Sequence, residues 1–225
     1  MSGSAPAIAG ASPRLGAVIT VRRALGSIRT SNHGGPPLVG NGFEDLAALA
    51  EVGVRSVRLS FDWSRLQPVP GRLDDDWREW YGSVLLAARE VGLEVWAALH
   101  EESVPGWFDD EGSFGDERTA GRLWPRWVEA VAEEFGDRVD GWFPIVDPLA
   151  VASRWSHDTM HHERALLSVV TAWRDAWRIL RGGPPVATAL GLRVVSPVDR
   201  TVPAAAAARL EDHLRWPLWL RALRD

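Results

Sequence analysis

Short β-branched runs alternate with longer stretches of helical hydrophobic period along this chain. Strands are predicted over residues 15–21, 54–60, 93–99, 139–146 and 186–195. Helices are predicted over residues 43–52, 74–91, 118–135, 162–180 and 203–214. Apolar residues recur at three- and four-residue intervals in the helical stretches, and Gly53, Gly92 and Gly136 close three of them. The pattern therefore predicts five strand–helix units in succession.

A strand–helix alternation of this kind predicts a parallel sheet with right-handed crossover helices. We expect the α/β class and, within it, an incomplete TIM-type (β/α) barrel of about five units. Residues 14–225 should form this partial barrel as one domain, behind a flexible Ser/Ala-rich tail over residues 1–13. Polar and aromatic side chains recur where the predicted strands end, which is the working face of such a barrel.

Composition excludes several classes of function. The chain of 225 residues is 46% hydrophobic and 24% charged, which is typical of a soluble globular domain. A net charge of −5 without a basic stripe predicts no nucleic-acid partner. No segment approaches the ~20 apolar residues that cross a bilayer, so no membrane role is expected. The absence of Cys and of a signal-like N-terminus favours the cytoplasm. We expect no cofactor.

Four motifs in a fixed order carry a family resemblance. They are Arg58-Leu59-Ser60 with Trp63-Ser64-Arg65, the segment from Leu99 to Pro105, Phe135-Gly136-Asp137-Arg138-Val139, and Trp142 to Pro148. Between about Phe43 and Asp212 the chain resembles the N-terminal half of family 1 glycoside hydrolases, the β-glucosidase and β-galactosidase family. The resemblance implies O-glycosyl hydrolysis in carbohydrate metabolism.

The resemblance also implies residue roles. Asp147 stands at the position of the family's general acid/base Glu, and it is the catalytic residue we predict. Val146 replaces the Asn that holds the sugar 2-hydroxyl, and Glu101 replaces a sugar-contacting His. Arg58 corresponds to the Arg that braces the family's nucleophile. The predicted substrate-binding residues are Arg58, His100, Glu101, Trp63, Trp107 and Trp142.

Two departures from the family pattern predict weak activity. Asp is one methylene shorter than Glu, and a loss of about 1 Å in reach costs on the order of a hundredfold in rate. Val146 cannot donate or accept a hydrogen bond. The family's second carboxylate belongs to a seventh strand, beyond the five units predicted here, although retaining hydrolysis uses two carboxylates about 5–5.5 Å apart. We expect a truncated pseudoenzyme related to retaining β-glycosidases, with little or no activity as an isolated chain.

Two alternatives stay open. The first is a non-catalytic module that binds a carbohydrate or a partner chain, because the open edges of a partial barrel favour homo- or hetero-oligomers. The second is a repurposed acid/base enzyme that uses Glu101, Glu102 and Asp147. Without a nucleophile to brace, the charge of Arg58 must pair with Asp147 or Glu101 or face water.

Two further groups have plainer interpretations. His157, Asp158, His161 and His162 do not have a recognised zinc spacing, so no metal site is predicted. Six tryptophans lie at helical spacing and are expected to pack in the core: Trp77, Trp80, Trp124, Trp127, Trp173 and Trp177.

Overall fold

The structure, a computed structural model, describes residues 15–19, 42–101, 103–155, 159–191, 194–215 and 217–222. The predicted tail over residues 1–13 and Glu102 lie outside the described residues. The strands are β1 (Leu15–Ile19), β2 (Val54–Ser60), β3 (Glu94–Ala98) and β4 (Gly141–Phe143). The helices are α1 (Gly42–Glu51), α2 (Trp63–Leu66), α3 (Asp75–Glu90), α4 (Gly106–Asp110), α5 (Glu117–Phe135), α6 (Pro148–Arg154), α7 (Thr159–Leu180), α8 (Val202–Arg215) and α9 (Pro217–Ala222), with a 3-10 turn η2 (Ser113–Gly115).

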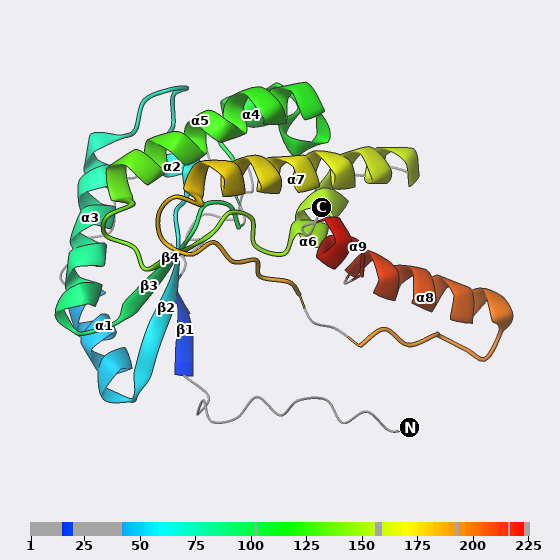
Figure 1. The fold of residues 1–225 in the computed structure, drawn as a ribbon, viewed down its shortest axis with the longest axis horizontal. Helices are drawn as coiled ribbons and strands as arrows, with labels where there is room; N and C mark the ends of the chain where they lie inside the picture. The colour runs from blue at the N-terminus through cyan, green and yellow to red at the C-terminus, as the bar shows by residue number, and fades with distance from the viewer. Residues whose placement is uncertain are drawn as a thin grey trace.

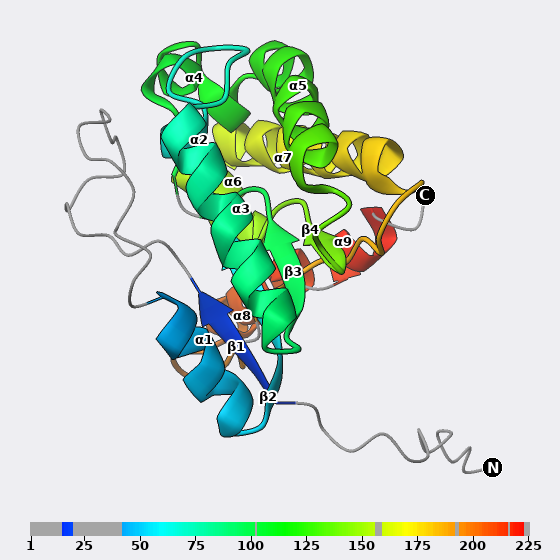
Figure 2. The same cartoon turned by 90° about the vertical axis from the view of Figure 1, so that its left-hand side faces the viewer.

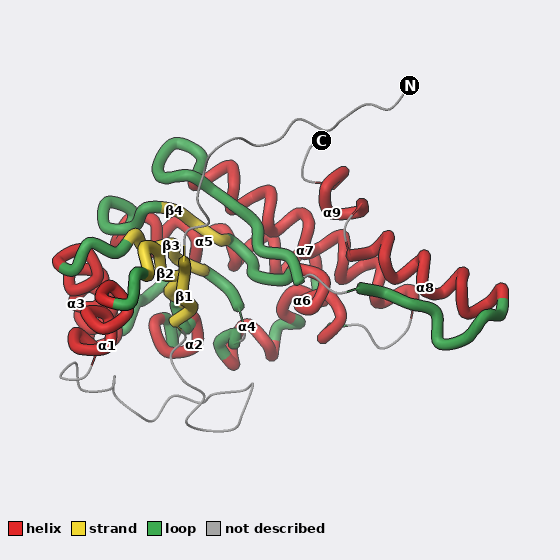
Figure 3. The backbone as a smooth tube through the Cα atoms, turned by 90° about the horizontal axis from the view of Figure 1, so that it is seen from below, coloured by secondary structure: helices red, strands yellow, loops and turns green. Residues whose placement is uncertain are grey.

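The four strands form one parallel sheet in the order β1-β2-β3-β4, as the strand–helix alternation predicts (Figure 1). Helix α3 packs on β3 and on α1, and it runs alongside β3 in Figure 2. Helix α5 packs on α7, and α8 contacts α9. This arrangement is the α/β architecture of a TIM-type barrel wall, and Figure 3 shows α1 and α3 together beside the strands.

Alternation along the strands separates two faces of the sheet. Val57, Leu59 and Val95 point toward the helices and are at most 3% exposed. The opposite face, which we call the inner face, carries Arg58 and its cross-strand neighbour Trp96, both partly exposed. The core therefore lies between the sheet and the helices.

The predicted fifth strand is wrong. Within residues 186–191 and 194–195 the structure has no strand, and only two isolated parallel bridges join this segment to the fourth-strand region, Trp142 to Val186 and Val146 to Ala189. Strand β4 is also shorter than the predicted 139–146, because Pro144 has no N–H to donate to a ladder. A three-residue strand offers too little edge for a regular fifth one.

The first residues of the helices are set by N-cap hydrogen bonds rather than by the hydrophobic period of the sequence. Asp74 caps α3 by accepting from the Trp77 N–H at 3.1 Å, and Asp116 caps α5 by accepting from the Thr119 N–H at 2.7 Å. These caps place the starts of α3 and α5 within one residue of the predicted helices. Hydrogen bonds from Thr119 hold the pKa of Asp116 below its usual value.

Most of the tryptophans expected in the core are there. Trp77, Trp124, Trp127 and Trp173 are at most 7% exposed. Trp177 is the exception, with 40% exposure, and Trp80 is half-buried. Over the described part of the chain, no helix has the length and apolar character that crossing a membrane requires.

Candidate functional site

The candidate residues come from three neighbouring strand ends. Arg58 and Ser60 belong to the last half of β2, His100 and Glu101 follow β3, and Asp147 follows β4. Parallel strands bring these ends to one edge of the sheet, which is where a TIM-type barrel places its active site. The backbone ties two of these loops together, since the Val146 N–H donates to the His100 carbonyl at 2.9 Å.

Arg58 and Glu101 form an ion pair on the inner face. Arg58 Nη2 donates to Glu101 Oε1 at 2.5 Å, and the two side chains are 22% and 16% exposed. The hydroxyl of Ser60 donates to the other Glu101 oxygen, Oε2. Of the two partners that the sequence left open for Arg58, the structure therefore selects Glu101. The Nε atom of Arg58 is buried and has no hydrogen-bond partner among the described residues.

Asp147 is held by a different set of contacts. It has a left-handed backbone with φ 47°, a conformation that Asp tolerates better than most residues. Its Oδ1 accepts from the Ala150 N–H at 3.4 Å at the start of α6, and its own N–H donates to the Ala189 carbonyl at 2.8 Å. Over the described residues, no ion pair or hydrogen bond joins its side chain to Arg58 or Glu101.

Backbone from the fifth-strand position lies against the Asp147 carboxylate. A Cβ atom added to Gly191 would lie 2.5 Å from Asp147 Oδ2, so a side chain at this position would displace the carboxylate. Neighbouring Val146 is 8% exposed and contributes an apolar side chain where the resemblance implies an amide. The carboxylate thus serves as a helix cap in a close-packed corner.

His100 is a buried neutral imidazole rather than a surface ligand. It is 2% exposed, and its ring lies 5.0 Å from that of Phe114. Burial, aided by the charge of Arg154, lowers its pKa to about 3, while a hydrogen bond with the Ser103 backbone opposes the shift. Its Nδ1 atom has no hydrogen-bond partner in the described part of the chain.

The three predicted sugar-binding tryptophans do not share an accessible face. Trp63 is 0% exposed and stacks on Trp127 with ring centroids 5.3 Å apart. Trp142 is 1% exposed and points to the helices, because alternation along β4 puts Gly141 and Phe143 on the inner face. Trp107 is half-buried, and its Nε1 donates to the Gln67 carbonyl at 3.1 Å. The expectation of ligand-facing rings is therefore corrected for Trp63 and Trp142.

Sequence reasoning missed Trp96. It is the cross-strand neighbour of Arg58 in the β2–β3 register and shares the inner face with it. The signal was available in the sequence, because alternation along the predicted strand puts Trp96 on the face opposite Val95 and Ala97.

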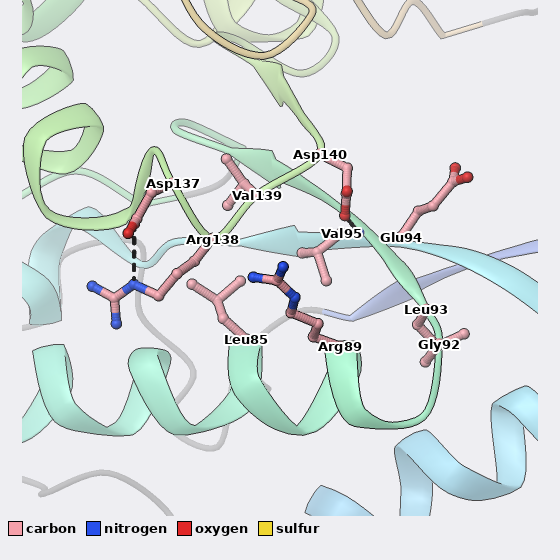
Figure 4. A pocket seen from close by; sticks show the side chains of 10 residues that line it. All are labelled: Leu85, Arg89, Gly92, Leu93, Glu94, Val95, Asp137, Arg138, Val139 and Asp140. Carbon is pink, nitrogen blue, oxygen red and sulfur yellow. Dashed lines mark hydrogen bonds and ion pairs between the residues drawn. The ribbon is translucent and has the colours of Figure 1, made fainter.

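A cavity beside the sheet lies away from these residues. It measures about 250 Å³ and is lined by the end of α3, the start of β3 and the loop before β4 (Figure 4). Arg138 pairs with Asp137 there across 3.5 Å, and the Asp140 carboxylate accepts from the Val95 N–H at 2.7 Å. The cavity lies at the N-terminal ends of β3 and β4. Residues on this side of a (β/α) barrel contribute to stability.

Metal ligation gains no support from the described residues, which contain no cluster of three or more His, Asp or Glu side chains suited to a metal ion. His157 and Asp158 lie outside the described residues, as do the side chains of His161 and His162 on α7.

Solved structures show the fold class to which this chain belongs. A family 1 β-glucosidase from Thermotoga maritima matches with a TM-score of 0.70 at 19% identity, over 78% of this chain and 42% of that chain. A β-glycosidase from Pyrococcus horikoshii matches with a TM-score of 0.72 at 21% identity, over 80% of this chain and 44% of that one. The fold is that of the TIM-barrel glycosidases.

The chain belongs to glycosyl hydrolase family 1, whose family model matches residues 41–173, more than half of its length. It is 24% identical over 139 residues to β-glucosidase A of Thermotoga maritima, and 32% identical over 123 residues to β-glucosidase 3 of Oryza sativa subsp. japonica. These matches cover 61% and 51% of this chain but 31% and 23% of the relatives. The chain therefore spans less than a third of the length of these relatives.

Proposed function

We propose that this chain has β-glycosides as its ligand class and hydrolyses them slowly or not at all. The observation that carries the low rate is the Asp147 carboxylate, which caps α6 and lies against Gly191. A general acid must reach the leaving oxygen of its substrate within about 2.6–3.2 Å. A shortened side chain already engaged as a helix cap is poorly placed to do so.

The neighbouring substitutions support the same conclusion. Val146 offers the sugar no hydrogen bond, whereas such contacts strengthen in the transition state of glycoside hydrolysis. Glu101 and Arg58 neutralise one another. The resemblance implies that Arg58 would brace a nucleophile, but its positive charge is paired with Glu101 instead. Each difference removes transition-state stabilisation rather than fold stability.

Turnover of aryl β-glucosides and aryl β-galactosides by the purified chain tests the proposal. We expect Asp147→Ala to change the rate by less than about threefold, because Asp147 contributes little to the chemistry. Asp116→Ala is the matched control, since it also removes an N-cap carboxylate, at the start of α5. Steady turnover that falls by about a hundredfold or more in Asp147→Ala, but not in Asp116→Ala, would contradict the proposal.

A second candidate function is association with a second copy through strand β1. In the described sheet β1 pairs with β2 on one side, and Leu15 and Val18 are 55% and 56% exposed. An open strand edge is a template for pairing with another chain. Light scattering over a range of concentrations should then show a dimer that Val18→Lys weakens. A monomer at every concentration, or a dimer that is indifferent to Val18→Lys, would rule out this edge.

A further inference from the structure

The peptide bond between Asp147 and Pro148 follows a strained residue. Asp147 has φ 47° and ψ 66°, and among the described residues only one other non-glycine residue, Ser113, has a positive φ. A proline restricts the residue before it to extended backbone with ψ of roughly +120 to +160°. The left-handed conformation of Asp147 is therefore costly, and backbone strain of this kind is concentrated at sites that act chemically.

The Asp147 carboxyl is confined beside its own backbone. Its Oδ1 accepts from the Ala150 N–H at 3.4 Å, which is long for a hydrogen bond, and its Oδ2 has no hydrogen bond over the described part of the chain. A Cβ atom built on Gly191 would lie 2.5 Å from Oδ2, so the Gly191 backbone limits where this oxygen can move. The carboxyl group is thus held in place while one of its oxygens stays available.

The carbonyl of the same peptide bond is polarised. Its oxygen accepts from the Val151 N–H at 3.1 Å, and the Asp147 N–H is held by the Ala189 carbonyl at 2.8 Å. A fixed N–H beside a carbonyl oxygen stabilises the negative charge that develops there when a nucleophile adds to the carbonyl carbon. Pro148 is buried, but Asp147 is partly exposed, so water has access to the Asp147 side of the bond.

We propose that this chain cleaves its own backbone between Asp147 and Pro148. A carboxyl oxygen of Asp147 adds to the carbonyl carbon of the same residue and closes a five-membered ring. The C–N bond to Pro148 breaks, the carboxyl proton goes to the Pro148 nitrogen, and a cyclic anhydride remains. Water then opens the anhydride and leaves Asp147 with two free carboxyl groups. One water molecule is consumed, and nothing is oxidised or reduced.

The folded structure favours this reaction in three ways. Cleavage releases the strain at Asp147, the confined carboxyl stays near its target, and the Val151 N–H stabilises the oxyanion. None of these effects requires a glycoside, so the reaction goes beyond the function proposed above. Its products are residues 1–147 and residues 148–225, the second with proline at its new N-terminus.

Mass spectrometry of the full chain after incubation at about pH 5, where carboxyl protons are available, tests the proposal. The folded chain should give the two fragments at least about tenfold faster than the chain unfolded in urea at the same pH, because unfolding removes the strain and the confinement. Asp147→Ala removes the nucleophile, and Pro148→Ala removes the restriction on the backbone of Asp147. Each substitution should slow the cleavage by at least about tenfold.

Two other aspartates provide controls within the same molecule. Asp74 and Asp116 also cap helices, but their backbones are extended, with φ −74° and −110°, and neither precedes a proline. The bonds that follow them should stay intact while the bond after Asp147 is cleaved. Absence of the two fragments, or cleavage that is as fast in urea as in the folded chain, overturns the proposal. Neither result affects the proposed hydrolytic deficit, since that proposal is judged by the turnover of glycosides.

Discussion

At Asp147 the backbone and the side chain are fixed by separate contacts. The N–H donates to Ala189 at 2.8 Å, and the carboxylate caps α6 at Ala150. Close approach of Gly191 to Oδ2 completes the corner. These contacts hold the Asp147 carboxylate in the corner between the start of α6 and Gly191.

The lowered pKa of His100 predicts that the free energy of unfolding depends on pH. Its pKa is lowered from the usual 6.5 to about 3 in the folded chain. Between these values the unfolded chain binds a proton that the folded chain does not, so the free energy of unfolding rises with pH. We expect a loss of up to about 3 kcal/mol between pH 7 and pH 4 from this residue, measured by urea unfolding.

His100→Gln should flatten that part of the profile, because glutamine does not titrate. His213→Gln, on α8, is the control and should keep the wild-type slope. If the free energy of unfolding depends on pH in the same way for the wild type and His100→Gln, another group causes that dependence.

The sequence located the charged residues of the site but not their pairing. Glu101 and Asp147 follow β3 and β4, and Arg58 lies two residues before the end of β2. The choice of Glu101 over Asp147 as the partner of Arg58 depends on side-chain distances that no motif encodes. Trp142 was misassigned because its motif was considered as a unit, whereas residues in a strand alternate between two faces.

At the scale of elements, the short helices were not predicted because they are stabilised by tertiary packing rather than by a sequence pattern of their own. Helix α2 has four residues and α4 has five, too few for a hydrophobic period to show. Asp62 caps α2 by accepting from the Arg65 N–H at 3.3 Å. The buried Trp63 ring then anchors the helix, with its Nε1 donating to Gln67 Oε1 at 2.9 Å.

Trp63→Ala should therefore destabilise the whole domain. Trp63 is fully buried among Trp107, Phe108, Trp124 and Trp127, and truncating a buried tryptophan costs about 3–5 kcal/mol. Trp177→Ala is the matched control, because its ring is 40% exposed and its loss should cost less than about 1 kcal/mol. Urea unfolding of the two variants measures the difference. Similar losses would mean that the aromatic cluster around α2 is not a cooperative part of the core.

For the whole molecule, the strand–helix alternation predicted the parallel sheet, and together with the family resemblance it predicted the TIM-type fold, but with one strand too many. Residues 186–195 have β-branched and apolar character, yet a strand needs a partner of sufficient length. Pro144 shortens β4, and Pro184 and Pro185 supply no N–H at the start of the fifth position. Strand propensity alone could not predict that β4 is too short to pair with a fifth strand.

Hydrogen exchange can test this difference between the two sides of β4. The Leu99 N–H donates to the Phe143 carbonyl at 3.0 Å, and the Ala187 N–H donates to the Trp142 carbonyl at 2.8 Å. Leu99 is 0% exposed and continues the regular β3–β4 ladder, whereas Ala187 is partly exposed beside isolated bridges. Because exchange reports the free energy of local opening, Ala187 should exchange at least about a hundredfold faster, a gap of roughly 2.8 kcal/mol. Equal protection of the two amides would mean that residues 186–189 act as a full fifth strand in solution.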